Sequence, residues 1–483
     1  MKDNNSKPTP VEKRRVCAKC IGEEYLVDLI TKANSKEVCS YCDKTAPTIP
    51  MPELGEHVER AIRQFYELTA SEPDGYEYYL QRESGEWDRS GEPITDVIAE
   101  ILEADDEIAK DVREVISDRT GDLESAFLGE EQPFDEDAHY AEAQATDHSK
   151  LSAEYHRFEE IVTERARYFS PEARQILSSL FGQLEGMRTT RGRPLIVEAG
   201  PDLAVREFFR ARVFQDDELL KRALTFPDQE LGPPPARVGR AGRLNAAGVS
   251  IFYGADNAAV ALAEVRPPVG SRVVIARFEL LRRVRLLDIN ALESLLVKGS
   301  LFDPEHMIRL RHAAFLDSFS ARFTRPVMPE HEVLEYIPTQ AIADYLAQEV
   351  SPPLDGILYT SAQSESVGGK NVALFHKSSR VEQLVRPAEM TSDVSFGHYT
   401  EEGFEQDYSV YETEPKSPAK RSARRLRHVI REIQNPIADR DIRTPALRMD
   451  ENSLTVHHVR SVEVHSDAHS VTRIRDVRGN VEI

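Results

Sequence analysis

The sequence predicts an α+β protein in which a four-cysteine module and a helical domain precede a mixed α+β domain. All four cysteines of the 483-residue chain fall within its first 42 residues. Apolar residues then recur at helical spacing up to about residue 190, and short β-prone runs alternate with helical candidates from about residue 195. We expect a zinc-ribbon-like module at 11–46, an acidic helical domain at 53–190, an α+β domain at 200–390, and a polar linker with a C-terminal extension at 391–483.

The cysteines form two Cys-x-x-Cys knuckles, Cys17 with Cys20 and Cys39 with Cys42, with 18 residues between them. This spacing is typical of a zinc site with four thiolate ligands, because each knuckle presents two sulfurs to one ion. Four thiolates leave no open coordination position, so the expected zinc is structural rather than catalytic. The alternative is four unrelated reduced cysteines.

The helical domain is predicted from its apolar spacing. A helix is expected over Leu54–Ala70 after a stiff Pro-rich linker at Pro47–Pro52. Pro93 opens one longer helix that continues to about Val115. The acidic segment Gly129–Lys150 is predicted to be a loop, and helices resume from Leu151 to Met187 with a break near Pro171.

The α+β domain is predicted from short runs of β-branched and aromatic residues. The expected strands are Phe208–Phe214, Val249–Tyr253, Arg272–Glu279, Val284–Asp288 and Ile357–Thr360. The expected helices are Ala258–Val265, His306–Phe323 and Thr339–Val350. Residues 391–425 are predicted to be a polar excursion, and Leu454–Val464 offers one late strand.

Charge is distributed unevenly along the chain. Residues 51–150 hold 29 acidic and 8 basic residues, a net of −21 against −22 for the whole chain, whereas 201–300 holds 12 acidic and 15 basic residues. The acidic segment should repel nucleic acid, so nucleic acid is not an expected partner even though Lys13, Arg14, Arg15 and Lys19 flank the cysteines. The sequence has no run of about 18 apolar residues and no apolar N-terminal stretch. We therefore expect a cytoplasmic protein without membrane association.

A group of Arg, Gly, Tyr and Glu residues suggests an anion-binding site with a reactive carboxylate. Arginines beside glycines can hold a pyrophosphate, because paired N–H donors act where the backbone approaches closely. Tyr253 offers an aromatic face to a flat ring, and a carboxylate such as Glu264 on an otherwise apolar helix is either paired or functional. The structural alternative is a set of surface arginines, a core tyrosine and a salt bridge at a helix end. The group comprises Phe208-Phe-Arg210-Ala-Arg212, Gly239-Arg-Ala-Gly242-Arg243-Leu-Asn245, Tyr253 and Glu264.

The order of these pieces resembles the RES domain, a family named for an Arg, a Glu and a Ser whose members cleave the nicotinamide–ribose bond of NAD. The central block is the stretch from Gly239 to Glu264. The later blocks are Pro338–Leu346, Asp355–Ser361 and Gly368–Phe375, so the resemblance covers about residues 205–380. The N-terminal region similarly resembles the HEPN-type region that precedes RES domains in some bacterial proteins.

The resemblance implies a fold similar to diphtheria-toxin-like ADP-ribosyltransferases, with NAD as the substrate in a cleft. The family's Arg corresponds to Arg210, with Arg212 as the close alternative, and its Glu corresponds to Glu264. Its Ser corresponds to Ser361, with Ser364 and Ser366 nearby. The expected catalytic residues are Glu264, Arg210, Ser361 and Tyr253, and the expected NAD-binding residues are Arg243, Asn245, Arg212 and Asn371.

The activity implied is cleavage of NAD by water or by phosphate, between which the sequence does not choose. A bacterial toxin or defence protein is expected, with an antitoxin or immunity protein as a partner. One alternative is an ADP-ribosyltransferase that modifies a macromolecule, although Leu262 stands where such enzymes often carry a second Glu or Gln. The other is a non-enzymatic zinc and helical adaptor with an inactive RES-like domain. Arg119 and His139 are too far apart for the HEPN ribonuclease signature, so the helical domain is expected to be non-catalytic.

Overall fold

In a computed structural model of the chain, contacts divide the protein into two compact units, each described here by itself. The N-terminal unit combines Met1–Glu160 with Gly186–Pro194 and Ala291–Arg322. The second unit combines Ile161–Glu185, Leu195–Asn290 and Phe323–Ile483. The structure describes residues 10–33, 35–73, 78, 89–121, 131–143, 148–235, 238–328, 330–360, 368–387, 390–401, 403–414, 441–463 and 466–473.

The cysteine module of the N-terminal unit is a three-stranded antiparallel sheet with one helix. The sheet has the order β1-β3-β2 and comprises β1 (Arg15–Cys17), β2 (Lys36–Val38) and β3 (Thr45–Pro50), and the helix is α1 (Glu24–Ala33). The predicted linker at Pro47–Pro52 is wrong, since most of it is β3 and α2 begins at Met51. Thr48 and Ile49, between the two prolines of β3, bury their side chains, and the N–H of Thr48 donates to the carbonyl of Ser35.

Three helices and a second small sheet complete the main core of this unit. The helices are α2 (Met51–Phe65), α4 (Ile94–Leu102) and α5 (Asp106–Thr120), and the sheet holds β4 (Tyr66–Leu68), β5 (Glu92–Pro93) and β6 (His139–Glu142). The single helix predicted after Pro93 is instead two helices, because Glu103 takes a left-handed φ of 48° and ends α4. The N–H of Gly22 donates to the carbonyls of Leu102 and Glu103 at this break. β6 lies in the segment predicted to be a loop, so that prediction is wrong there.

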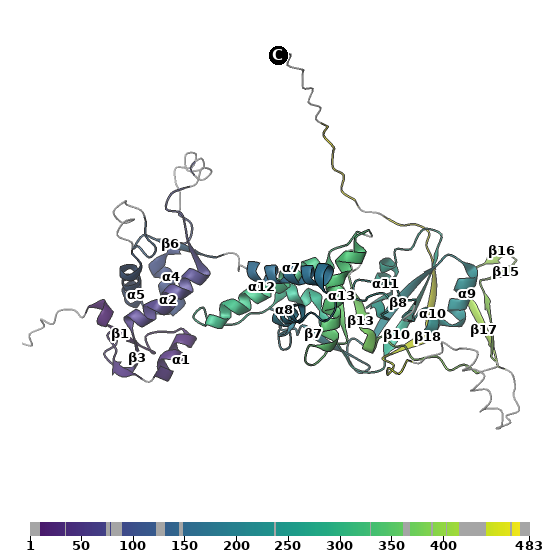
Figure 1. Ribbon diagram of the computed structural model, residues 1–483, viewed down its shortest axis with the longest axis horizontal. Helices are drawn as coiled ribbons and strands as arrows, with labels where there is room; N and C mark the ends of the chain where they lie inside the picture. Colours follow the sequence, from purple (N-terminus) through teal and green to yellow (C-terminus); the bar gives the residue numbers. More distant parts are fainter. Residues whose placement is uncertain are drawn as a thin grey trace, which may run out of the picture. The chain divides into compact units, whose positions relative to one another are not determined.

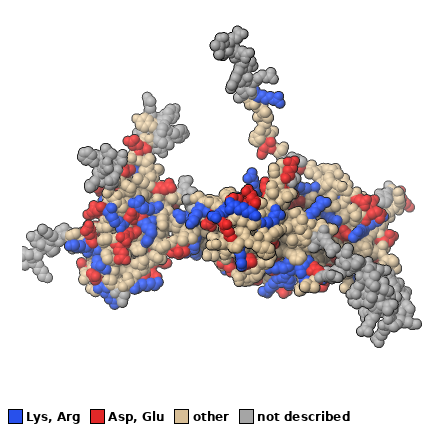
Figure 2. Space-filling view, in the orientation of Figure 1, with Lys and Arg blue, Asp and Glu red and all other residues tan. Residues whose placement is uncertain are grey.

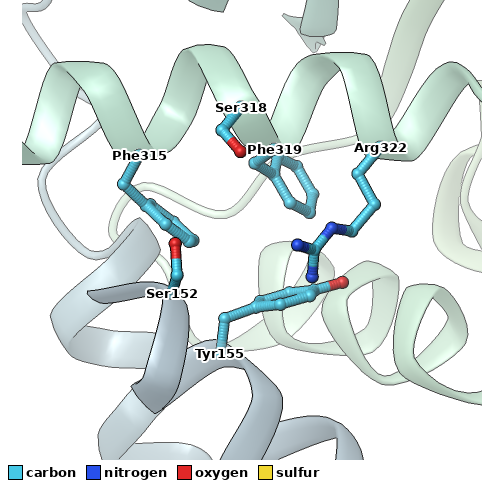
Figure 3. A pocket seen from close by; sticks show the side chains of 6 residues that line it. All are labelled: Ser152, Tyr155, Phe315, Ser318, Phe319 and Arg322. Carbon is cyan, nitrogen blue, oxygen red and sulfur yellow. The ribbon is translucent and has the colours of Figure 1, made fainter. Parts of the chain in front are cut away.

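A helix pair forms a further contact in the N-terminal unit. Tyr155 of α7 (Ser149–Glu160) packs against Phe315 and Phe319 of α12 (Pro304–Thr324), with ring centroids 6.0 and 5.8 Å apart (Figure 3). The guanidinium of Arg322 lies 5.1 Å from the centre of the Tyr155 ring, a cation–π distance. These side chains fill the space between the helices, so the contact is structural.

The second unit is built on a mixed eight-stranded sheet with the order β18-β10-β8-β9-β13-β12-β11-β7. Figure 1 labels β7, β13, β8, β10 and β18 of this sheet. Only β11 and β12 are parallel neighbours, and the other pairs are antiparallel. The strands are β7 (Ile196–Ala199), β8 (Glu207–Phe214), β9 (Phe252–Ala255), β10 (Arg272–Leu280), β11 (Val284–Asp288), β12 (Gly356–Thr360), β13 (Lys370–Leu374) and β18 (Leu447–His458). Four of the five predicted strands are confirmed as β8, β10, β11 and β12. The strand predicted at Val249–Tyr253 overlaps β9 at two residues, and the late strand predicted at Leu454–Val464 begins earlier, as β18, and ends at His458. The strands β7 and β13 were not predicted.

Both faces of this sheet are buried. Side chains of Phe208, Phe252 and Phe278 point into one core, while Ala211 and Val273 belong to the other, which α11 covers. The predicted helices are confirmed, although α13 begins earlier than expected and contains Pro338. The helices of this unit are α8 (Pro171–Phe181), α9 (Asp217–Thr225), α10 (Pro227–Glu230), α11 (Ala258–Glu264) and α13 (Glu332–Gln348).

The segment predicted to be a polar excursion holds two hairpins. They are formed by β14 (Thr391–Ser395) with β17 (Ser409–Thr413), and by β15 (His398–Thr400) with β16 (Gly403–Glu405).

Acidic and basic side chains are interspersed on the visible face of the N-terminal unit (Figure 2). Within the described ranges, no helix is both long enough and apolar enough to cross a lipid bilayer.

Candidate active site and metal centre

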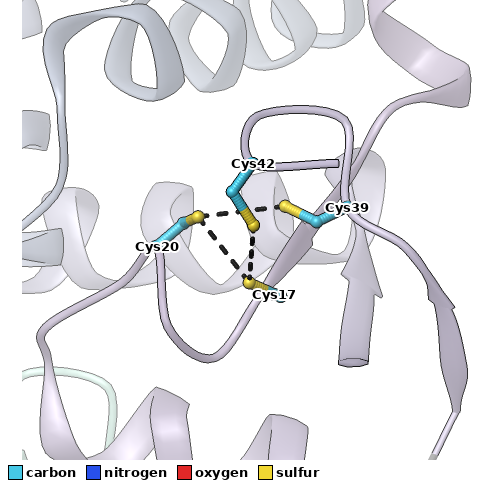
Figure 4. Close-up of side chains that lie close together, drawn as sticks. All are labelled: Cys17, Cys20, Cys39 and Cys42. Carbon is cyan, nitrogen blue, oxygen red and sulfur yellow. Dashed lines mark hydrogen bonds between the residues drawn. The ribbon is translucent and has the colours of Figure 1, made fainter. Parts of the chain in front are cut away.

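The four cysteines come together in the N-terminal unit (Figure 4). Cys17 ends β1 and Cys39 directly follows β2, and both are fully buried, while Cys20 and Cys42 lie in the turns that follow. A hydrogen bond from the backbone N–H of Lys44 lowers the pKa of Cys42 to about 7. Cys42 therefore reaches the thiolate form, which binds metal, near neutral pH, whereas burial raises the pKa of Cys17 and of Cys20.

The sulfur positions fit a tetrahedral zinc ion. The Sγ atoms lie 3.6 Å apart for Cys17 and Cys20, 3.6 Å for Cys17 and Cys42, and 3.9 Å for Cys20 and Cys39. Four thiolates at the usual Zn–S length of about 2.3 Å stand about 3.8 Å from one another around a tetrahedron. The site could therefore hold a metal ion such as zinc.

A buried carboxylate ties the cysteine module to the helices. The hydroxyl of Tyr41, between Cys39 and Cys42, donates to Asp111 of α5 over 2.5 Å, and Arg14 donates to the same oxygen over 2.5 Å. Asp111 is 7% exposed, so this carboxylate depends on both partners. Arg14, which flanks the cysteines, is thus engaged inside the unit rather than presented to a nucleic acid.

In the second unit a cavity of about 450 Å³ opens between the strands β8 and β9, α11 and the start of α13. This volume lies within the range of small-molecule sites, about 300–1,000 Å³. The structure brings five of the predicted residues together along its wall: Arg210, Arg243, Tyr253, Glu264 and Asn371. It does not bring Arg212 or Asn245 to that wall.

The cavity exists because β8 and β9 separate. Their pairing consists of one register pair, Phe209 opposite Ala255, and the strands diverge beyond it. The guanidinium of Arg210 bridges the gap by donating to the main-chain carbonyl of Tyr253 over 2.6 Å. Burial lowers the pKa of Arg210 to about 10, which leaves it a cation at neutral pH. Arg210 thus holds the split in the sheet and lines it.

The Tyr253 ring is positioned by its hydroxyl. This hydroxyl donates to Oδ1 of Asn245 over 2.8 Å and accepts from the N–H of Leu244. A Cβ atom at Gly242 would lie 2.8 Å from Oδ1 of Asn245 and 2.9 Å from the Tyr253 hydroxyl, so glycine is required there. Asn245 itself is 5% exposed and donates to the carbonyls of Arg240, Ala246 and Val249. The polar atoms of Asn245 thus hold this loop together and do not line the cavity, and its expected contact with NAD stays a prediction.

Glu264 is the last residue of α11 and is held from the neighbouring sheet. The side-chain amide of Asn371, on β13, donates to Oε2 of Glu264 over 2.8 Å. Asn371 is 2% exposed, and its Oδ1 has no hydrogen-bond partner among the residues described. The cavity therefore presents a carboxylate that is oriented by a buried amide.

Two arginines of the predicted site, Arg212 and Arg243, have hydrogen-bond partners within the protein. Arg212 is exposed and lies outside the cavity wall, where it pairs with the Glu230 carboxylate at 2.8 Å and donates to the Glu230 carbonyl, so its expected contact with NAD stays a prediction. Arg243 does line the cavity, but its guanidinium donates to the carbonyls of Phe323 and Arg325. Of the two candidates for the family's Arg, only Arg210 therefore lies at the cavity.

Sequence reasoning missed several residues of the cavity. Tyr336, Tyr359, Arg266 and Glu332 also line it. Tyr359 lies in the block Asp355–Ser361, but nothing in the sequence assigned it a role. Tyr336 lies before Thr339, where the helix was predicted to begin. Burial raises the pKa of Tyr359 far above its usual value, so its phenol stays protonated. The predicted Ser361, with Ser364 and Ser366, lies outside the described residues.

These features define a mixed α+β domain with a carboxylate in a split-sheet cavity, joined in sequence to a helical unit that carries four clustered cysteines. Comparison with protein families matches residues 208–396 to the RES domain and residues 32–175 to HEPN/RES N-terminal domain 1. The chain is a RES-domain protein with a HEPN/RES N-terminal region. No curated protein matches the chain, and no solved structure does either. This pair of domains fits a protein of the toxin–antitoxin type, and the RES family is associated with NAD-related enzymatic activity.

Proposed function

We propose that this protein cleaves the nicotinamide–ribose bond of NAD, with Glu264 as the catalytic carboxylate. The observation that carries the proposal is the hydrogen bond from buried Asn371 to Glu264 at the cavity wall. A carboxylate fixed in this way can face a positively charged sugar carbon, as carboxylates do in glycoside cleavage. We also propose that the fold of this domain resembles that of ADP-ribosyltransferases.

The reaction needs little proton transfer. The bond between C1′ of the ribose and N1 of nicotinamide breaks, and its electron pair stays on N1, which neutralises the pyridinium ring. The ribose carbon is left with positive charge, which Glu264 stabilises until water or phosphate adds to it. Water loses a proton and gives ADP-ribose, while phosphate gives ADP-ribose 1″-phosphate.

The aromatic residues would hold the leaving group. Tyr253, Tyr336 and Tyr359 line the cavity with their rings, and an aromatic face suits the flat cationic nicotinamide. Because the hydroxyl of Tyr253 is occupied by Asn245 and Leu244, its ring orientation is fixed before substrate binds. Such preorganisation lowers the cost of bringing the substrate into the reactive geometry.

The test is nicotinamide release from NAD by the full-length protein, followed by NMR with and without phosphate. Glu264→Gln keeps the shape and removes the charge, and we expect it to lower turnover by at least about 100-fold. Glu279→Gln is the matched control, because Glu279 is an exposed carboxylate of β10 outside the cavity. Normal turnover in Glu264→Gln, or no release by the wild type, would contradict the proposal. Transfer of ADP-ribose to a protein or nucleic acid would instead identify a transferase.

A further inference from the structure

Three arginines line the cavity, and two of them have fixed partners. Arg210 donates to the carbonyl of Tyr253. Arg243 donates to Phe323 and Arg325, and its guanidinium also stacks at 5.6 Å over the Tyr336 ring. The third is Arg266, for which no carboxylate lies within ion-pair distance among the residues described.

Arg266 is held at the cavity by an unusual backbone. Its φ is +43°, a left-handed conformation that costs free energy for a side chain of this size. Its N–H donates to the carbonyl of Ala263, and the following Pro267 cannot continue the helix. The chain therefore turns sharply after Glu264, and the Arg266 side chain becomes part of the cavity wall rather than of a longer α11.

Arg243, Arg266 and Tyr336 all line this cavity. Burial raises the pKa of the Tyr336 phenol, and the charges of Arg243 and Arg266 both act against that rise. Two arginines thus line the same cavity as Tyr336, and of these two Arg243 has its donors engaged by carbonyls. A cationic group with available donors in such a place suits an anion that offers several oxygens.

We propose that Arg266 binds the diphosphate of the substrate and thereby selects a dinucleotide over a nucleoside. This inference rests on the proposed function, because it takes the ribose to face Glu264. The two residues are separated by one position, so their Cα atoms are at most about 7 Å apart. In NAD the 5′-phosphate is attached to the same ribose, which matches that short separation.

The experiment compares NAD with nicotinamide riboside, which carries the same glycosidic bond and no phosphate. Arg266→Asn removes the guanidinium, and asparagine tolerates the left-handed backbone. Loss of a charge-assisted hydrogen bond should raise KM for NAD about tenfold or more, with kcat/KM for nicotinamide riboside unchanged. Arg266→Lys should retain much of the affinity. Arg206→Asn is the matched control, since Arg206 is exposed and outside the cavity.

Two results would overturn the inference: an unchanged KM for NAD, or equal losses on both substrates. Calorimetric titration with ADP-ribose separates this failure from failure of the proposed reaction. If the wild type releases no nicotinamide but binds ADP-ribose about tenfold more tightly than Arg266→Asn does, the diphosphate site stands and the cleavage proposal falls. If the wild type does not bind ADP-ribose, or both proteins bind it equally, Arg266 has no such role.

Discussion

The side-chain amide of Asn371 donates a 2.8 Å hydrogen bond to Glu264 and so joins β13 to the end of α11. The donor is almost fully buried, whereas the carboxylate it holds is exposed at the cavity. A rigid sheet residue therefore orients a group at the end of a seven-residue helix. The hydrogen bond therefore fixes the direction of the Glu264 carboxylate while leaving it exposed at the cavity.

Asn371→Ala should lower kcat for NAD cleavage by about 10- to 100-fold with little change in KM, because a hydrogen bond to a charged group contributes about 1.5–3 kcal/mol. Asn371→Asp should be at least as damaging, since it sets a second carboxylate against Glu264. Steady-state kinetics measures both values. Asn452→Ala, at an exposed position of β18, is the control. A rise in KM at constant kcat would assign Asn371 to binding rather than to positioning.

Asn245→Ala should destabilise the second unit by about 2–4 kcal/mol, because it removes three donated hydrogen bonds and the acceptor of the Tyr253 hydroxyl. Tyr253→Phe removes only the hydroxyl and should cost about 1 kcal/mol. Differential scanning calorimetry of the two variants tests this order. Equal transitions in Asn245→Ala and the wild type would show that the loop does not depend on this side chain.

The purified protein should contain one zinc ion per chain, and Cys39→Ser should lose it. Because Cys39 is fully buried, the serine hydroxyl of the variant would lie inside the module without a metal ion to bind. Elemental analysis measures the zinc, and limited proteolysis should cut the N-terminal unit of the variant faster. Lys19→Ala changes an exposed residue of the first knuckle and should retain the ion. A metal-free wild type with four reactive thiols would refute the site.

The N-terminal unit should lose stability as the pH falls below about 6.5, the usual pKa of histidine. His306 is 6% exposed and stacks on Phe65 with ring centroids 5.9 Å apart. Burial, with the charge of Arg309, lowers the pKa of His306, so below pH 6.5 the unfolded chain binds a proton that the folded chain does not. Denaturation of His306→Gln between pH 7 and 5 should show a smaller loss. The same pH dependence in that variant would assign the effect to other groups.

The sequence was sufficient to predict those residues of the cavity that a motif identifies by their order along the chain. Arg210, Tyr253, Glu264 and Asn371 meet at one cavity, as the resemblance to the RES domain implied. Arg210 and Arg212 could not be separated from sequence, because residues two apart on a strand share a face. The structure distinguishes them, because Arg210 donates to the Tyr253 carbonyl at the cavity and Arg212 pairs with Glu230 outside it.

Other parts depend on orientation, which a motif does not specify. Asn245 was expected at the substrate, yet its amide faces the carbonyls of its own loop. Tyr336 was missed because α13 was predicted to begin at Thr339, whereas it begins at Glu332. The left-handed backbone of Arg266 gave no sequence signal beyond the proline that follows it.

The strand β18 bears on how the chain is synthesised. Its twelve residues, Leu447–His458, pair along β10 and lie well beyond the end of the RES match at residue 396. Since translation proceeds from the N-terminus, β10 remains an open sheet edge until the ribosome has passed residue 458. An unpaired edge of this kind can add a strand from another chain. Two forms of the chain would therefore be the most prone to associate with other copies through β10. One is the nascent chain on an mRNA that carries several ribosomes, and the other is a fragment that ends at residue 396, where the RES match ends.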